Sequence, residues 1–543
     1  WRELRLPVRS IVTRDGRIQQ APPAGVPDGG AWAELAGRPV AEARRRVVAL
    51  LRASGDLLGE PRPIRHPVKF YERGERPLEI VTSRQWFIRV LDHRERLLEL
   101  GRALDWIPDF MRVRYEHWVN GLNSDWLISR QRFFGVPVPL WYPVTAGGEL
   151  DHDNPILPGE DRLPVDPSSD VPDGYRPEHR GRPGGFAADP DVMDTWATSS
   201  LTPQIAGGWQ DDPELFARVF PMDLRPQGPE IIRTWLFYTV VRSSIEHGEL
   251  PWRSAAISGW VLDPDRKKMS KSVGNVLTPA GLLERYGADA VRYWAARGRP
   301  GTDTAPDEAQ MRVGRRLAVK LLNASRFVLG LPGERAGGSP NGPDREAGEP
   351  TQPLDLAMLA GLDKVAAAAT ASLEAAQWTD ALERTEAFFW TFCDDYLELV
   401  KDRAYGAAGE PGATSARAAL AGALEVLLRL LAPYLPYATE EVWSWWRDGS
   451  VHQAPWPDRV PAGRGADPLP LEAAGLVLGA VRRAKSQARL PLRAPVTRVV
   501  VTGTPERLAA VRAAEPDLRA AGRVAAVEYL ERDDPPLTAE IIL

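Results

Sequence analysis

The sequence predicts a mixed α/β region, then an all-α helical bundle, then a small α/β tail. Short β-like runs occur in the first 78 residues, and residues 144–189 are rich in Pro, Gly and Asp. Beyond about residue 305, apolar residues recur at helical spacing in long runs. From about residue 471, short strand-like alternation returns. At 543 residues, the chain is long enough for several domains with cores of their own.

In the α/β region, residues 9–12 form a short β-like run, and an amphipathic pattern predicts a helix over residues 40–53. An apolar segment over residues 259–263 ends at an Asp-Pro-Asp turn. After it, Pro279 suits the first turn of a helix, and Thr278 is placed to cap that helix.

The second half reads as helices separated by a Gly/Pro-rich break over residues 331–353. Further on, Pro436 ends one helix, and Glu440 and Glu441 favour the first turn of the next. In the tail, alternating residues predict two strands. The predicted helices cover residues 310–328, 354–373, 378–405 and 416–431, and the strands cover residues 496–501 and 527–530.

Composition indicates a large enzyme of a reducing compartment. Hydrophobic residues make up 43% and charged residues 26%, which is ordinary for globular proteins. The net charge of −5 does not exclude a nucleic-acid partner, because binding needs a local basic face only. Cys393 is the only cysteine, so no intrachain disulfide can form, and its aromatic neighbours indicate helix packing. We see no apolar run of membrane-spanning length and no signal peptide, so we expect a cytoplasmic protein without a membrane partner.

The most informative motif is Lys-Met-Ser-Lys-Ser at residues 268–272, followed by Gly274 and Asn275. Two lysines and two hydroxyls in a mobile loop suit the triphosphate of ATP. The lysines would neutralise charge on a departing pyrophosphate, and the serines would fix its oxygens. The alternative is a solvated basic turn. We take Lys268, Met269, Ser270, Lys271 and Ser272 as candidate catalytic residues.

This motif resembles the signature loop of class I aminoacyl-tRNA synthetases. Three further segments are similar to that family and stand in the family's order: residues 125–132 ("DWLISRQR"), 135–139 ("GVPVP") and 287–294 ("GADAVRYW"). The resemblance implies a Rossmann-type catalytic fold that the chain re-enters after an editing insertion.

Two more segments, residues 191–203 and 225–235, resemble the valine-specific members of the family, especially their archaeal-like branch. The resemblance implies that Trp196, Ile231 and Trp235 line a small apolar pocket for the valine side chain. Such a pocket cannot strongly reject threonine, so an editing site is expected. Both tryptophans have an alternative role as core aromatics.

The resemblance also assigns an ATP contact to Glu230, which would accept hydrogen bonds from the adenosine ribose, and to Gly228. Pro229 departs from the family's usual residue, which leaves the local backbone open. Alternatively, Glu230 is an acid favoured at a helix N-terminus. With ATP we expect Mg²⁺ as part of the substrate complex.

The helical half contains a segment, residues 431–443, that resembles the anticodon-binding domains of this family. We take five basic residues as candidate tRNA contacts, against the alternative that they are solvated helix charges. Two lie on one predicted helix and three in the tail: Lys401, Arg403, Arg482, Arg483 and Lys485.

The chain starts at Trp1 and contains no His-x-Gly-His, the family's other ATP motif. We therefore expect a C-terminal part of a longer protein, entered within the editing insertion and inactive alone. The expected domains are part of the editing domain (1–82), the catalytic half (83–305), the anticodon-binding bundle (306–470) and a small appendage (471–543). Relatives often hold zinc between the re-entry and "DTW" segments. Residues 144–189 have no cysteine, so we expect no structural zinc.

The resemblance thus implies ATP-dependent ligation of L-valine to tRNA(Val) through valyl-adenylate, with post-transfer editing by the full-length enzyme, expected to be a monomer. Two alternatives remain. An isoleucine-specific relative would differ at the "DTW" segment. A truncated, non-catalytic tRNA-binding protein would use only the bundle and tail, and would not need the Lys-Met-Ser-Lys-Ser loop.

Overall fold

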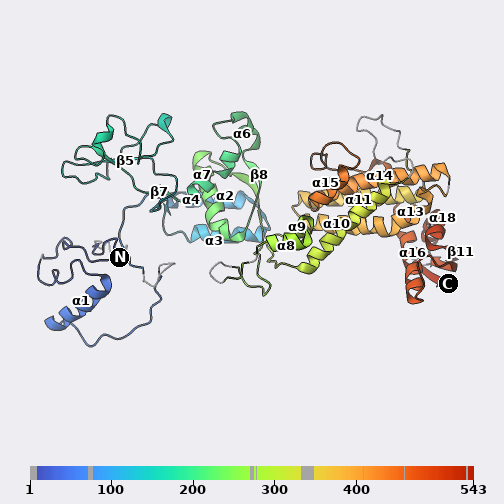
Figure 1. Ribbon diagram of the computed structural model, residues 1–543, viewed down its shortest axis with the longest axis horizontal. Helices are drawn as coiled ribbons and strands as arrows, with labels where there is room; N and C mark the ends of the chain where they lie inside the picture. The colour runs from blue at the N-terminus through green and yellow to red at the C-terminus, as the bar shows by residue number, and fades with distance from the viewer. Residues whose placement is uncertain are drawn as a thin grey trace. The chain divides into compact units, whose positions relative to one another are not determined.

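A computed structural model gives the fold, which comprises two compact units (Figure 1). The first unit contains Trp1–Asp92 and Asn123–Ala197, and the second contains His93–Leu122 and Thr198–Leu543. The domain boundaries expected at residues 82, 305 and 470 stay predictions. The structure describes residues 9–27, 29–70, 78–269, 274–276, 278–331, 348–407, 409–457, 459–533 and 536–543.

The first unit combines one long helix with short antiparallel strand pairs. The helix α1 ends at Gly55, whose φ of +81° is a left-handed conformation that glycine adopts without strain. The strands pair as β1 with β3, β4 with β7, and β5 with β6. The elements are α1 (Val40–Ser54), β1 (Phe87–Ile88), β3 (Trp126–Leu127), β4 (Ser129–Arg130), β5 (Trp141–Pro143), β6 (Phe186–Ala188) and β7 (Val192–Met193). Residues 9–12 form no strand, only an isolated bridge between Val12 and Ile18.

The second unit begins with a parallel sheet of order β2-β9-β8. One face is covered by helices, because Trp106 of β2 packs on Tyr115 of α3, which in turn contacts Phe237 of α7. Parallel strands are normally buried in this way. The elements of this part are α2 (Arg94–Ala103), β2 (Asp105–Ile107), α3 (Arg112–Asn120), α4 (Thr195–Ser199, across the unit boundary), α5 (Thr202–Ala206), α6 (Pro213–Val219), β8 (Met222–Gln227), α7 (Phe237–Glu246) and β9 (Trp252–Ile257).

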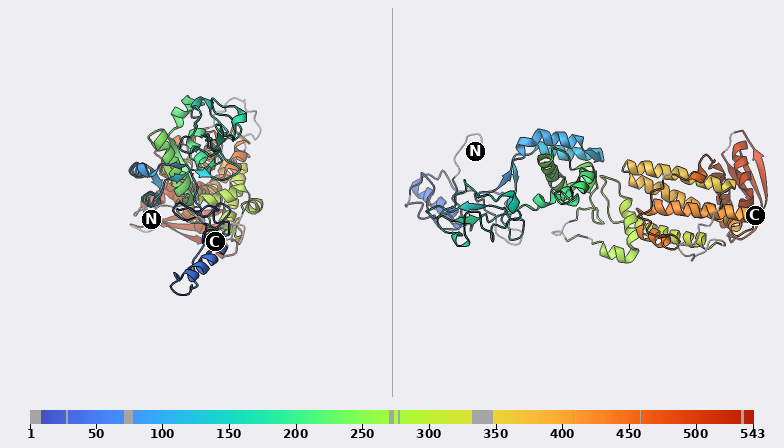
Figure 2. Two further views of the ribbon diagram at one scale, coloured as in Figure 1. Left: turned by 90° about the vertical axis from the view of Figure 1, so that its left-hand side faces the viewer. Right: turned by 90° about the horizontal axis from the view of Figure 1, so that it is seen from above.

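A set of helices follows (Figure 2). All of them except the first, Ala280–Tyr286, contribute side chains to one apolar core. The run predicted over 378–405 is continuous, but a π-helical turn at Phe392–Tyr396 divides it into α12 and α13. The helices are α8 (Ala280–Tyr286), α9 (Ala288–Ala296), α10 (Glu308–Leu329), α11 (Pro353–Glu374), α12 (Trp378–Thr391), α13 (Leu397–Ala404), α14 (Glu410–Leu431) and α15 (Pro436–Trp443).

Two helix starts differ from the prediction. No capping bond comes from Thr278, because α8 begins only at Ala280, after Pro279. The first turn of α15 carries no acid. Instead, the carboxylate of Asp289 accepts hydrogen bonds from the backbone N–H groups of Tyr437 (3.1 Å) and Ala438 (2.8 Å). A side chain distant in sequence thus caps this helix.

The C-terminal appendage is a three-stranded sheet of order β11-β10-β12, covered by helices. The central strand β10 pairs in parallel with β11 and antiparallel with β12. Both predicted strands are present and longer than predicted, whereas β12 and the two short helices were not predicted. The elements are α16 (Leu469–Gln487), β10 (Val496–Gly503), α17 (Pro505–Ala513), α18 (Glu515–Gly522), β11 (Val524–Glu531) and β12 (Thr538–Ile542).

One helix in the described part of the chain, α11, is long and apolar enough to span a membrane by composition alone. Its apolar side chains are part of the bundle core, as Ala357, Met358 and Leu362 are fully buried. It also carries Asp355, which is fully buried and paired with an arginine. These contacts are those of a core helix in a helical bundle.

Candidate functional site

The approach to the Lys-Met-Ser-Lys-Ser loop is tightly packed. After β9, Gly259 passes against Thr302, whose carbonyl oxygen would lie 2.0 Å from a Cβ at this position, so only glycine fits. The next backbone N–H, that of Trp260, donates to Asp303 at 2.8 Å. A parallel bridge from Val261 to Thr304 continues the contact. The loop therefore leaves from a fixed base.

A single carboxylate, that of Asp263, joins the two arms of the loop. It accepts the backbone N–H of Lys267 at 2.7 Å and the side-chain amide of Asn275 at 2.8 Å. Hydrogen bonding by Lys267 and then by Asn275 lowers the pKa of Asp263, so the carboxylate is charged at neutral pH. The Asn275 amide also donates to the backbone oxygen of Lys268 at 3.2 Å. This pair is a candidate loop clasp that the motif alone did not reveal.

Of the five loop candidates, Lys268 and Met269 lie in the described residues, whereas Ser270, Lys271 and Ser272 lie outside them. The exposed Lys268 ammonium sits 3.9 Å from the centroid of the Trp260 ring. Such an exposed cation–π contact is worth about 0.5–1 kcal/mol. It holds the lysine weakly and leaves it free to exchange toward an anion.

The end of β8 brings Gly228 and Glu230 together. A Cβ at Gly228 would lie 2.5 Å from a carboxylate oxygen of Glu230, so the glycine leaves room for that side chain. Glu230 is exposed, and Pro229 is buried at the start of a 3₁₀ turn. An exposed carboxylate beyond the carboxyl end of a parallel strand is where α/β folds bind nucleotides.

Directly after this turn, a π-helical segment Ile232–Leu236 carries Trp235. Such segments are frequent at functional sites. The Arg225 guanidinium lies 3.0 Å from the centroid of the Trp235 ring. Burial lowers the pKa of Arg225 to about 10, and its buried Nη2 has no hydrogen-bond partner. Sequence reasoning named Trp235 but missed Arg225, because nothing in the sequence pattern shows that this arginine turns inward.

In the first unit, β4 and β7 bring the "ISRQR" and "DTW" segments side by side, pairing Ser129 with Met193. The buried Asp194 carboxylate forms an ion pair with the Arg130 guanidinium at 3.1 Å and accepts a hydrogen bond from the indole N–H of Trp126 at 3.2 Å. Trp196 follows and is half-buried. It belongs to the first unit, whereas Ile231 and Trp235, both half-buried, belong to the second. Their common pocket stays a prediction.

The structure corrects two of the five predicted tRNA contacts. Arg403 is buried and binds Asp355 and Asp517 at 2.7 and 2.9 Å. Lys485 is buried, and its ammonium donates to two backbone carbonyls, those of Leu492 and Gly522, at 2.8 Å each. Neither side chain is presented to a phosphate.

The other three basic candidates reach the surface. Lys401 has a side chain 45% exposed and lies 3.9 Å from Glu398. Arg482 is partly exposed, with Asp395 at 3.2 Å, and Arg483 is exposed. Their contact with tRNA stays a prediction.

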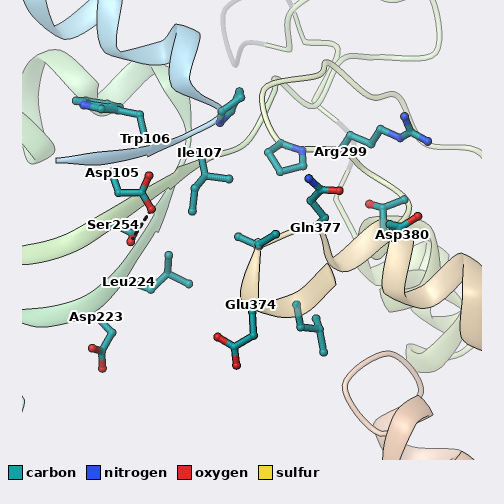
Figure 3. Close-up of a pocket in the computed structure, with 16 residues that line it drawn as sticks. Asp105, Trp106, Ile107, Asp223, Leu224, Ser254, Arg299, Glu374, Gln377 and Asp380 are labelled. Carbon is teal, nitrogen blue, oxygen red and sulfur yellow. Dashed lines mark hydrogen bonds between the residues drawn. The ribbon is translucent and has the colours of Figure 1, made fainter. Parts of the chain in front are cut away.

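A cavity of about 900 Å³ lies elsewhere in the second unit (Figure 3). Asp105 and Ser254, hydrogen-bonded at 3.1 Å, lie on its sheet side, and Gln377 and Asp380 on its helix side. The charged lining residues are Asp105, Asp223, Glu374 and Asp380 against Arg299 alone. This negative balance does not suit a triphosphate. No group of His, Cys, Asp or Glu within the described ranges is arranged to hold a metal ion.

Comparison with known proteins gives two family matches. The family described as tRNA synthetases class I (I, L, M and V) matches residues 40–307, and the anticodon-binding domain of tRNA ligase matches residues 355–501. A valine–tRNA ligase of Thermobifida fusca (strain YX) is 59% identical, and one of Salinispora arenicola (strain CNS-205) is 55% identical, each over 100% of this chain. The chain spans 62% and 65% of these relatives.

Among solved structures, the chain is similar to a methionyl-tRNA synthetase of Mycobacterium tuberculosis in complex with methionyl-adenylate. The sequence identity is 24% and the TM-score is 0.49, over 73% of this chain and 68% of the other.

Proposed function

The chain belongs to the class I aminoacyl-tRNA synthetases, and on that premise we propose that the intact protein joins L-valine to tRNA(Val). The observation that carries the proposal is the similarity, along the whole chain, to relatives described as valine–tRNA ligases. The Lys-Met-Ser-Lys-Ser loop, unbroken in this chain, gives that similarity a chemical basis.

The first step forms valyl-adenylate. A valine carboxylate oxygen attacks the α-phosphorus of ATP, a new P–O bond forms, and pyrophosphate leaves. Lys268 and Lys271 offset the charge that develops on the pyrophosphate, and Ser270 and Ser272 donate to its oxygens. Lys268 exchanges its weak contact with Trp260 for this anion. Mg²⁺ enters with ATP as part of the substrate.

The site around Glu230 and Trp235 holds the two substrates. The exposed Glu230 carboxylate accepts hydrogen bonds from the ribose hydroxyls of ATP, with Gly228 leaving it room. From the sequence motifs we assign the valine side chain to Trp196, Ile231 and Trp235, an apolar set that would exclude larger side chains sterically. The Arg225 guanidinium fixes the ring plane of Trp235 from the sheet side.

In the second step, a terminal ribose hydroxyl of the tRNA attacks the valyl carbonyl, and AMP leaves. Positioning and charge stabilisation supply most of the acceleration, and no general base is needed. The bundle and appendage hold the tRNA, with Lys401, Arg482 and Arg483 as basic contacts at the surface. The intact protein acts in the cytoplasm as a monomer, and hydrolyses mischarged tRNA after transfer.

The test is amino-acid-dependent ATP–pyrophosphate exchange by the intact protein, with valine compared with isoleucine. We expect exchange with valine at least about tenfold faster, since a pocket distinguishes one methylene by about 1–3 kcal/mol. Faster exchange with isoleucine would favour the isoleucine-specific alternative.

A loop variant separates the enzyme from a pure tRNA-binding protein. Lys271→Ala should lower exchange by a factor of about 100 or more while tRNA affinity is retained. The matched control is Lys364→Ala, at an exposed lysine of α11. A wild-type protein that binds tRNA(Val) but exchanges no pyrophosphate would instead support the binding-only alternative.

A further inference from the structure

Two adjacent phenylalanines are exposed to solvent in the loop that follows β4 (Ser129–Arg130). Phe133 is 91% exposed and Phe134 is 87% exposed. Their rings lie edge to face, with centroids 4.9 Å apart and planes at 84°. Large exposed aromatic groups are costly to solvate, and a contiguous pair of them commonly marks a binding surface.

The loop under this pair is anchored at both ends. The Gln131 side-chain amide donates to Asp191 at 2.9 Å, and the Met193 N–H donates to the Val136 oxygen at 2.7 Å. Between them, a Cβ at Gly135 would lie 2.7 Å from a Val192 methyl carbon, so glycine permits this close approach. The exposed rings therefore stand on a fixed base.

The charge at the tip is positive. Arg132, the residue that precedes the ring pair in the sequence, is exposed. The nearby carboxylates of Asp191 and Asp194 are buried and already accept hydrogen bonds or an ion pair. Proteins commonly hold unpaired nucleotides with exposed aromatic rings and a cation from the same segment. Bases stack on the rings while the cation meets a phosphate.

The position of the loop indicates which nucleotides these are. The same strand β7 that anchors the loop continues into Asp194 and Trp196, the segment to which we assign the valine side chain. We propose that Phe133 and Phe134, with Arg132, bind the unpaired nucleotides at the 3′ end of the tRNA. The proposal rests on the proposed function, because that 3′ end must reach the aminoacyl group.

The test compares two RNAs on the intact protein. One is tRNA(Val), and the other is the same tRNA without its unpaired 3′ nucleotides. The double variant Phe133→Ala/Phe134→Ala should weaken binding of the first by about tenfold, within the range for loss of stacking on one base, and leave the second unchanged. Phe133→Tyr/Phe134→Tyr keeps both ring faces and should bind both RNAs as the wild type does.

Phe110→Ala is the matched control, because Phe110 is a phenylalanine 58% exposed in the other unit. Equal weakening for both RNAs, or no weakening for either, overturns the proposal. So does a drop of several degrees in Tm for the double alanine variant, since it would mean that the pair packs against the rest of the intact protein. A wild type that neither binds tRNA(Val) nor exchanges pyrophosphate would instead refute the proposed function itself.

Discussion

Replacing Arg403 with alanine removes the one cation from a buried cluster that joins α11, α13 and α18. The guanidinium donates two bonds of 2.7 Å to Asp355 and bonds of 2.9 to 3.2 Å to Asp517. Burial acts to lower the pKa of Arg403, but the bonds to the two carboxylates outweigh it and raise the pKa. The group stays charged, so its loss leaves two carboxylates without their counter-ion.

The expected cost is about 3–5 kcal/mol, as for other buried ion pairs that lose one partner. Asp355 keeps its bonds from Tyr396 and Ser415, and Asp517 is 12% exposed and can bind water, so relief is only partial. For the second unit, at about 2.1 cal/mol/K of unfolding entropy per residue, Tm should fall by roughly 4 to 6 °C. Lys401→Ala, two residues earlier and 45% exposed, should change Tm by less than about 2 °C.

The assay is thermal unfolding of the intact protein, with tRNA affinity measured at several salt concentrations below the transition. We expect Arg403→Ala to lower Tm while leaving the slope of log affinity against log salt unchanged. An unchanged Tm with a salt slope reduced by about one would mean that Arg403 contacts a phosphate. That result would refute its role as the buried counter-ion of Asp355 and Asp517.

Four further predictions rest on individual contacts. Asp263→Asn keeps the shape but loses one acceptor of the loop clasp, so pyrophosphate exchange should fall roughly tenfold with Tm unchanged. Folding lowers the pKa of Asp263, so the stability that its carboxylate contributes is fully present above the unfolded pKa of about 3.9 and is lost only as pH falls through the folded pKa. Pyrophosphate exchange by the wild type should therefore show no inflection from Asp263 between about pH 5 and 9. Asp289→Ala removes the cap of α15 and should lower stability by about 1–2 kcal/mol, and Asp289→Asn by less, as measured by Tm; equal losses would contradict the two-oxygen geometry. Burial raises the pKa of the Cys393 thiol to about 12, so a thiol reagent should modify its peptide only as the protein unfolds, and modification of the native protein within minutes would contradict this.

The helices were predictable because their apolar periodicity is local. The bounds of α10 and α11 each lie within two residues of the prediction. The small strand β12 was missed because it carries only five residues and gains its order by pairing with β10. Tertiary pairing of this kind leaves no periodic signal in the sequence.

The candidate site was predictable only as far as motifs reach. The motifs in the sequence identified Lys268 and Glu230 as candidates. They did not predict the hydrogen bond between Asp263 and Asn275 that closes the loop. Charge on a helix is also ambiguous in sequence. Arg403 and Lys401 are two residues apart, yet one is buried and one is exposed, because a carboxylate from α18 faces only Arg403.

The most direct test of the central claim is attachment of valine to tRNA. Intact protein, ATP, Mg²⁺, radiolabelled valine and tRNA(Val) should yield label on the tRNA that mild base releases, as expected for an ester. Lys271→Ala should abolish that label while tRNA binding persists. A protein that binds tRNA(Val) tightly but never transfers valine to it would contradict the account.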